Sequence, residues 1–159
     1  MKIAVYPGSF DPITLGHLDI VSRVSPAFDK LIVLIAQNAE KKNLFTPEER
    51  VRLAKDVLKP FSNVEVLHNS GLTVEFAKNL GARFLIRGLR SESDFHHEWV
   101  VANMNRDLAP GIETLMIFAK PELSHISSRA VKEVAMNGGN LARWVPPVAA
   151  GELLKKLSR

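Results

Sequence analysis

Glycine, histidine and hydroxyl side chains gather near the start of this sequence, where a phosphate-binding protein would need them. The segment from Tyr6 to His17 reads YPGSFDPITLGH and joins a short apolar run to a segment with helical spacing. It therefore puts Gly16 and His17 at the start of the first expected helix. Unpaired backbone N–H groups and the helix dipole both favour an anion there. Since histidine adds a directional donor, the segment predicts an anion site.

Cationic or hydroxyl-bearing residues also follow the other apolar runs. Lys41 and Lys42 come after the second run, Thr73 after the third, residues 87–90 after the fourth, and residues 120 and 124–129 after the fifth. Ligands of open parallel sheets bind beyond the carboxyl ends of the strands. These loops would therefore meet at one edge, and such a ring of donors suits a polyphosphate.

The elements that must position these loops follow from the hydrophobic pattern. Apolar runs of strand length at 3–6, 31–36, 64–67, 84–86 and 115–118 alternate with helical spacing at 15–28, 47–58, 73–80, 92–108, 127–136 and 147–157. This alternation predicts an α/β fold: a Rossmann-like, doubly wound, five-stranded parallel sheet with helices on both faces and C-terminal helices. Thr46, Pro47 and Glu49 form a helix-start signal, and Gly81 is a helix-end signal.

The composition fits a single domain spanning residues 1–159, with 46% hydrophobic and 24% charged residues. The chain has no cysteine, which excludes disulfides and thiolate sites. No apolar run approaches the roughly 20 residues of a membrane span, and no signal peptide is visible, so we expect a cytoplasmic protein. The net charge of +4 is spread along the chain, which suits small anions at least as well as nucleic acid.

Several familiar site types are missing from the sequence. It contains no P-loop, no GxGxxG after the first strand and no GxSxG elbow. The acidic residues form no dense cluster, so a nucleotide's own phosphates would have to supply most ligands of Mg²⁺. Adjacent residues on a helix point in different directions, which argues against a zinc site at His96 and His97.

Each candidate also has a simpler interpretation. Gly16 and His17 alone would suit an ordinary helix start. Lys41 and Lys42 would suit a solvated loop. Ser127 and Ser128 would cap the last long helix, which is compatible with phosphate binding because both use the same N–H groups. The pair Arg87 and Arg90 is harder to dismiss, because it flanks a glycine directly after a buried strand.

Taken together, these motifs resemble the phosphopantetheine adenylyltransferase family of the nucleotidyltransferase superfamily, which carries a T/HxGH signature. The first motif is typical of the superfamily. The match to this one family is carried by Lys41-Lys42, by IRGLR at 86–90 and by NMNR at 103–106. The matching pieces run in the family's order over nearly the whole chain. They also include FTPEER at 45–50, Asp94, Phe95 and Glu98, ISS at 126–128 and VKEV at 131–134.

The resemblance implies transfer of AMP from ATP to phosphopantetheine, with Mg²⁺, in a cytoplasmic homohexamer that binds neither nucleic acid nor a membrane. It implies catalytic roles for His17, Lys41 and Arg90. It implies phosphopantetheine contacts at Ser9, Lys41, Thr73 and Arg87. It implies ATP contacts at Ser9, Phe10, His17, Gly88, Leu89, Arg90, Glu98, Leu123, Ser124, His125, Ile126, Ser127, Ser128 and Arg129.

The sequence departs from the family pattern at a few positions. Ser9 stands where threonine is frequent, and this keeps the hydroxyl. Leu123 replaces a frequent tryptophan, and His97 replaces a frequent tyrosine. Arg129 stands where a third hydroxyl residue is common, and one interpretation is that its side chain extends to the pyrophosphate end of ATP.

Two other classes of protein remain as alternatives. A cytidylyl- or nicotinamide-mononucleotide transferase would keep the first motif, but Lys41-Lys42 and IRGLR disfavour it. A non-catalytic protein that binds nucleotides or nucleic acid would explain the positive charge. The presence of His17, Arg87 and Arg90, with only one Tyr and two Trp, disfavours that class.

Overall fold

Five parallel strands form one sheet in the order β3-β2-β1-β4-β5 in the computed structural model, which describes residues 1–37 and 42–158. The strands are β1 (Ile3–Gly8), β2 (Lys30–Ala36), β3 (Val64–Asn69), β4 (Phe84–Leu89) and β5 (Glu113–Phe118). The α-helices are α1 (Leu15–Val24), α2 (Pro47–Leu58), α3 (Thr73–Asn79), α4 (Glu92–Leu108), α5 (Ser128–Met136) and α6 (Pro147–Leu157). Short 3-10 turns are η1 (Ser25–Ala27) and η2 (Pro121–Leu123). The expected α/β Rossmann-like architecture is confirmed.

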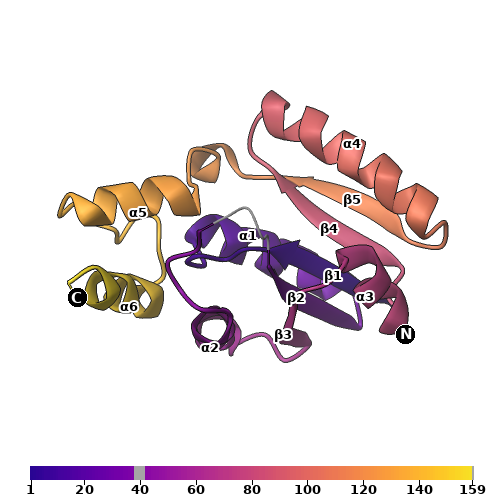
Figure 1. Ribbon diagram of the computed structural model, residues 1–159, viewed down its shortest axis with the longest axis horizontal. Helices are drawn as coiled ribbons and strands as arrows, with labels where there is room; N and C mark the ends of the chain where they lie inside the picture. The colour runs from indigo at the N-terminus through magenta and orange to yellow at the C-terminus, as the bar shows by residue number, and fades with distance from the viewer. Residues whose placement is uncertain (38–41, 159) are drawn as a thin grey trace.

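The strands bury side chains on both faces of the sheet. Ala4 and Tyr6 of β1 join one core cluster, which the inner faces of α1, α2, α5 and α6 complete, whereas Val5 joins a second cluster with α3. Figure 1 shows α4 lying along β4 and β5 at one side, and α5 with α6 at the opposite end. Alternate residues of a strand point to opposite faces, so a nearly continuous apolar run is what a covered sheet requires.

Most element boundaries agree with the sequence pattern. The Thr46 hydroxyl accepts from the Glu49 N–H, and the Glu49 carboxylate accepts from the Thr46 N–H, which completes the expected capping box. Gly81 has φ of 69° just after α3, as a helix end favours. One helix was expected too long: α1 ends at Val24, and Ser25–Ala27 continues as a 3-10 turn, because Pro26 has no N–H for the α-helical ladder.

The strands extend further at their carboxyl ends than the apolar runs suggested. Pro7 and Gly8 belong to β1, and Arg87, Gly88 and Leu89 belong to β4 rather than to the loop after it. Polar and glycine residues interrupt the hydrophobic pattern there, although the backbone ladder continues. The chemistry-bearing residues of β4 therefore lie on a strand, which holds them more rigidly than a loop would.

The sheet is joined less extensively between β1 and β4 than elsewhere. Over the described residues, the register of β1 with β2 runs from Ile3 to Gly8, whereas its register with β4 covers only Ala4 and Val5. No register pair joins the two strands beyond Val5 in the described residues, and the Tyr6 hydroxyl lies on the α1 face, 3.5 Å from where a Cβ on Gly88 would stand. Strand order reverses at this point of the sheet, where crevices form in such folds.

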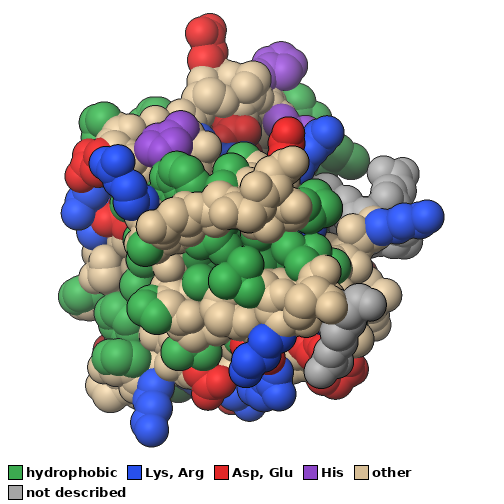
Figure 2. Space-filling view, turned by 90° about the vertical axis from the view of Figure 1, so that its left-hand side faces the viewer, with side chains coloured by type: hydrophobic (Ala, Val, Ile, Leu, Met, Phe, Trp, Pro, Cys, Tyr) green, Lys and Arg blue, Asp and Glu red, His purple; other side chains and the backbone are tan. Residues whose placement is uncertain are grey.

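Exposed apolar side chains gather on α4 and at the α5–α6 end. On α4 the side chains of Phe95, Trp99, Met104 and Leu108 are exposed, and Trp99 is 52% accessible. At the α5–α6 end, Figure 2 shows hydrophobic side chains gathered in the middle of the face; Met136, Val148 and Leu154 are exposed on these helices. Within the described residues, no helix is long and apolar enough to cross a membrane.

Candidate active site

A cavity of about 440 Å³ opens beside the carboxyl ends of β1 and β4, at the reversal of strand order. It brings together twelve of the residues expected from the sequence: Ser9, Phe10, His17, Arg87, Gly88, Arg90, Glu98, Leu123, Ile126, Ser127, Ser128 and Arg129. They come from the β1–α1 loop, α1, the end of β4, α4, η2 and the start of α5, so the fold gathers segments more than 100 residues apart. A second groove of about 450 Å³ runs along α2 beside His68 and contains none of them.

Some expected residues lie elsewhere. Thr73, Leu89, Ser124 and His125 are not part of the cavity lining found among the described residues. Thr73 starts α3, which follows the edge strand β3, whereas the cavity opens between β1 and β4. Lys41 lies outside the described residues. The roles of these five residues stay predictions.

His17 is held in one orientation by the residue that caps its own helix. The backbone N–H of Thr14 donates to His17 Nδ1 at 3.0 Å, and the Thr14 hydroxyl accepts from the His17 N–H at 3.4 Å. Because Nδ1 accepts from an N–H group, the ring proton of neutral His17 must lie on Nε2. Burial, and next the positive charge of Arg90, lower the pKa of His17 to about 4. The ring is therefore a neutral donor at pH 7.

Two aromatic rings, Tyr6 and Phe10, pack beside the ring of His17. Phe10 packs edge-on to Tyr6 with ring centroids 5.4 Å apart, and its centroid is 4.7 Å from that of His17. Phe10 has φ of 47°, a left-handed conformation that costs a non-glycine residue about 1–2 kcal/mol. Its buried ring offsets that cost. A Cβ on Gly8 would lie 2.9 Å from the Phe10 ring, so this packing requires glycine at position 8.

The opposite wall of the cavity carries cations that already have acidic partners. Arg87 donates from Nε and Nη2 to the two carboxylate oxygens of Glu98 at 2.5 and 2.6 Å, and its Nη1 donates to the Pro7 carbonyl at 3.2 Å. Arg90 donates to Asp94 at 3.1 Å and to the Ile126 carbonyl at 3.3 Å. Arg87 and Glu98, expected to hold different ligands, are thus partners of each other here.

The start of α5 forms a third side of the cavity. The Ser127 hydroxyl caps the helix by accepting from the Ala130 N–H at 3.0 Å. The Ser128 hydroxyl donates to the Pro12 carbonyl at 2.9 Å, which ties the helix to the loop between β1 and α1. Arg129 is exposed and lines the cavity. A cation in the first turn of a helix opposes the helix dipole, so an anion bound there would relieve the repulsion.

Three charged residues at the β1–α1 loop, the buried Asp11 and Arg50 and the half-buried Lys132, had no expected role. The Asp11 carboxylate accepts from the N–H groups of Leu44 and Phe45, both at 2.9 Å, and pairs with Lys132 at 2.6 Å. Arg50, also buried, donates to the carbonyl of Ser9 at 2.8 Å. Asp11 stands inside the first motif, but nothing in the sequence marked its carboxylate as buried, because charged residues are rarely found in a core.

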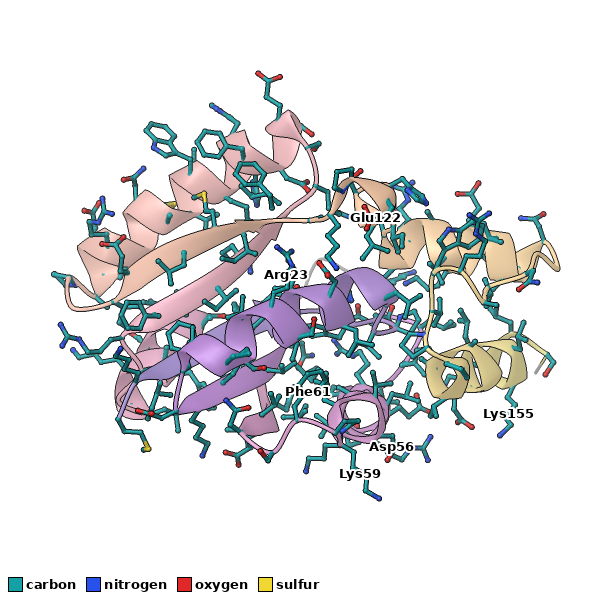
Figure 3. All side chains as sticks on the ribbon, turned by 180° about the vertical axis from the view of Figure 1, so that it is seen from behind. Arg23, Asp56, Lys59, Phe61, Glu122 and Lys155 are labelled. Atoms are coloured by element: carbon teal, nitrogen blue, oxygen red, sulfur yellow. The ribbon has the colours of Figure 1, made fainter. Side chains whose placement is uncertain are left out.

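Lys120, which the sequence placed among the cations at the sheet edge, is engaged elsewhere. Its ammonium lies 3.1 Å from Asp19 on α1. Asp19 also pairs with Arg23 at 2.8 Å, and Arg23 donates to the Phe118 carbonyl at 2.7 Å. Arg23, labelled in Figure 3, thus joins α1 to the end of β5. This group fastens the sheet edge to the helix instead of lining the cavity.

The acidic residues near the cavity are few and already paired. Among the described residues, no group of three or more His, Asp or Glu side chains could hold an ion by itself. The acidic residues in the lining are Asp94 and Glu98, and each is paired with an arginine.

Comparison with known proteins gives one consistent result. The cytidylyltransferase-like family model matches residues 5–134. A phosphopantetheine adenylyltransferase of Bdellovibrio bacteriovorus is 52% identical over 99% of both chains. One from Carboxydothermus hydrogenoformans is 50% identical over 100% of this chain and 98% of its own, and one from Caldanaerobacter subterraneus is 45% identical over 100% and 99%.

A solved structure extends the comparison to the fold. The structure described as a putative nicotinate-nucleotide adenylyltransferase from Vibrio parahaemolyticus superposes with a TM-score of 0.74, covering 100% of this chain and 96% of that one. Its sequence is 19% identical, so the likeness concerns the fold alone.

Proposed function

The chain belongs to the phosphopantetheine adenylyltransferase family, within the cytidylyltransferase-like group, and on this premise we propose its reaction. It transfers the adenylyl group of ATP to phosphopantetheine, giving dephospho-CoA and pyrophosphate in coenzyme A synthesis. The observation that carries the proposal is identity of 45–52% to three such enzymes over the full chain. The cavity supports it, because it offers donors to phosphate on three sides.

The reaction exchanges one phosphorus–oxygen bond for another. A phosphate oxygen of phosphopantetheine attacks the α-phosphorus of ATP, a new P–O bond forms, and the bond from the α-phosphorus to the bridging oxygen breaks as pyrophosphate leaves. The attacking phosphate is already ionised at neutral pH, so a strong base is unnecessary. The protein has to align two anions and match the developing charge. A cavity lined by hydroxyls, arginines and one histidine suits that task.

His17 is the residue best placed to act on the reacting phosphate. Its Nδ1 is occupied by the Thr14 N–H, so Nε2–H is the group left to donate. A neutral donor fixed before the substrates arrive stabilises charge that appears in the transition state without rearranging. We assign His17 to the α-phosphate oxygen, with Arg90 and the start of α5 at the leaving pyrophosphate.

Arg87 is assigned to the phosphate of phosphopantetheine, together with Lys41, which lies outside the described residues. The guanidinium already binds Glu98 in a bidentate pair. A second anion must therefore share Arg87 with Glu98 or displace it. Mg²⁺ would neutralise charge on the phosphates of ATP. Asp94 and Glu98 are the carboxylates in the lining that could contribute to holding it.

A homohexamer in the cytoplasm is the assembly we expect from the family. The exposed apolar side chains of α4 form two pairs, Phe95 with Trp99 and Met104 with Leu108, each four residues apart. Exposed apolar surface of this kind suits burial against another copy. Of the residues described for α4, only Glu98 is buried within the chain. Light scattering tests the assembly: a hexamer mass supports it, and a monomer mass contradicts it.

One assay tests the reaction against its alternatives. Purified protein is mixed with ATP, Mg²⁺ and phosphopantetheine, and pyrophosphate release is measured. Parallel mixtures replace ATP by CTP, or phosphopantetheine by nicotinamide mononucleotide. We expect release in the first mixture and background in the others. Release only in a control mixture would move the enzyme to a neighbouring family, and no release in any mixture would contradict enzymatic function.

A further inference from the structure

A buried carboxylate joins three segments that surround the cavity. Asp11 belongs to the β1–α1 loop and is 2% exposed. Its Oδ1 accepts from the Phe45 N–H and its Oδ2 from the Leu44 N–H, both in the segment before α2. The same Oδ2 receives the Lys132 ammonium of α5 at 2.6 Å. One side chain therefore fixes a loop, a helix start and a second helix relative to one another.

The helix α5 is attached to that loop at two points one turn apart. Ser128 donates to the Pro12 carbonyl at 2.9 Å, and Lys132 pairs with Asp11, the residue before Pro12. Residues four apart lie on the same face of a helix. The pairs therefore hold one face of α5 against the loop, while Val131 and Ala135 bury the apolar side in the core.

Both ends of this connection line the cavity. Phe10 and His17 belong to the loop and helix on one side, and Ser127 to Arg129 form the helix start on the other. The Lys132 side chain is 21% exposed and that of Asp11 is 3% exposed, so water screens the pair only weakly. This pair and the Ser128 hydrogen bond therefore link the two sides of the cavity.

We propose that Asp11 and Lys132 are positioning residues whose ion pair holds the start of α5 at the distance from His17 that ATP requires. Neither side chain is in the lining of the cavity, so they act through the backbone they hold. The inference rests on the proposed function for its kinetic readout, because it assumes that α5 meets ATP. The two charges would thus affect ATP binding without touching ATP.

Lys132→Met is the informative change. Methionine keeps most of the length and the packing of the stem but removes the charge, and Asp11 keeps both of its backbone N–H partners. We expect the KM for ATP to rise about tenfold, with the KM for phosphopantetheine and kcat changing less than about threefold. Lys132→Arg retains a cation that reaches Asp11, and it should restore the KM for ATP to within about threefold of the starting enzyme.

Lys156→Met is the matched control. Lys156 pairs with Glu49 at 2.7 Å and also joins a C-terminal helix to the rest of the chain, with 27% and 30% of the two side chains exposed, but away from the cavity. Its KM for ATP should stay unchanged. A Lys132→Met enzyme with an unaltered KM for ATP, or a Lys156→Met enzyme with an equal rise, would overturn the inference.

A measurement without turnover separates this inference from the proposed function. Amide hydrogen exchange should quicken in the first turn of α5 in Lys132→Met and stay unchanged there in Lys156→Met. If the starting enzyme releases no pyrophosphate, the proposed reaction is wrong whatever the exchange shows. If it is active and exchange in α5 is identical in all three proteins, the positioning role is wrong.

Discussion

The two long walls of the cavity are prepared for an anion in different ways. On the α1 wall, His17 is neutral and its tautomer is set by Thr14, which leaves Nε2–H as the group that can donate to a ligand. On the β4–α4 wall, Arg87 and Arg90 already have carboxylate partners. The first wall can act without rearranging, whereas the second must exchange partners when a phosphate arrives. We therefore expect changes on the α1 wall to alter kcat, and changes on the β4–α4 wall to alter KM.

The largest expected effect comes from removing the donor of the α1 wall. His17→Ala should lower kcat by about 100-fold or more while KM values change little, because one transition-state hydrogen bond is lost. Steady-state kinetics on a protein with unchanged circular dichroism checks this. Near-normal turnover of the folded variant would remove His17 from the chemistry.

A change on the β4–α4 wall should give the opposite pattern. Arg87→Ala should raise the KM for phosphopantetheine roughly 30-fold, about 2 kcal/mol for a charged hydrogen-bonding group, and raise the KM for ATP far less. Arg52→Ala, which removes an exposed arginine paired with Glu152 outside the cavity, is the control and should leave both KM values unchanged. A larger rise in the KM for ATP would reassign Arg87 to the nucleotide.

The neutral state of His17 predicts a dependence of stability on pH. Its pKa is about 4 in the folded chain and near 6.5 in the unfolded chain, so between these values only the unfolded chain binds the proton. The contribution of neutral His17 to the free energy of unfolding should therefore be complete above pH 6.5. It should be lost as the pH drops toward 4, which lowers the free energy of unfolding by up to about 3 kcal/mol. Urea unfolding of the protein and of His17→Gln across this range checks it. Parallel curves for the two would contradict the low pKa.

The smallest effects come from two helix caps that differ in what they hold. Thr14 caps α1 and positions His17, whereas Ser91 caps α4 by accepting from the Asp94 N–H. Either residue changed to alanine should cost about 1 kcal/mol of stability. Only Thr14→Ala should also slow turnover, because the Thr14 hydroxyl lies 3.0 Å from His17 Nδ1. The loss should be limited to a few-fold, because the backbone N–H of residue 14 still holds the ring. Equal kcat in the two variants would show that the hydroxyl has no part in orienting His17.

The sequence was sufficient for the architecture and for most of the cavity. Apolar runs marked the strands, and the rule that ligands meet the carboxyl ends of parallel strands grouped His17, Arg90 and Ser128 at one edge of the sheet. The pattern failed where the ladder continues through non-apolar residues, as at Arg87 and Gly88. It also gave no partner for any charge, because pairing between residues 11 and 132, or 87 and 98, depends on tertiary distances that spacing along the chain does not contain.

The short register between β1 and β4 has a mechanical consequence. Over the described residues it covers only Ala4 and Val5, so the three strands on one side and the two on the other are joined at the cavity by few backbone hydrogen bonds. The β1–β4 junction therefore resists bending less than the rest of the sheet, and a ligand that contacts both strands would stiffen it. We expect ATP to slow amide exchange in the second half of β4 more than in β2, where the ladder is already complete on both edges.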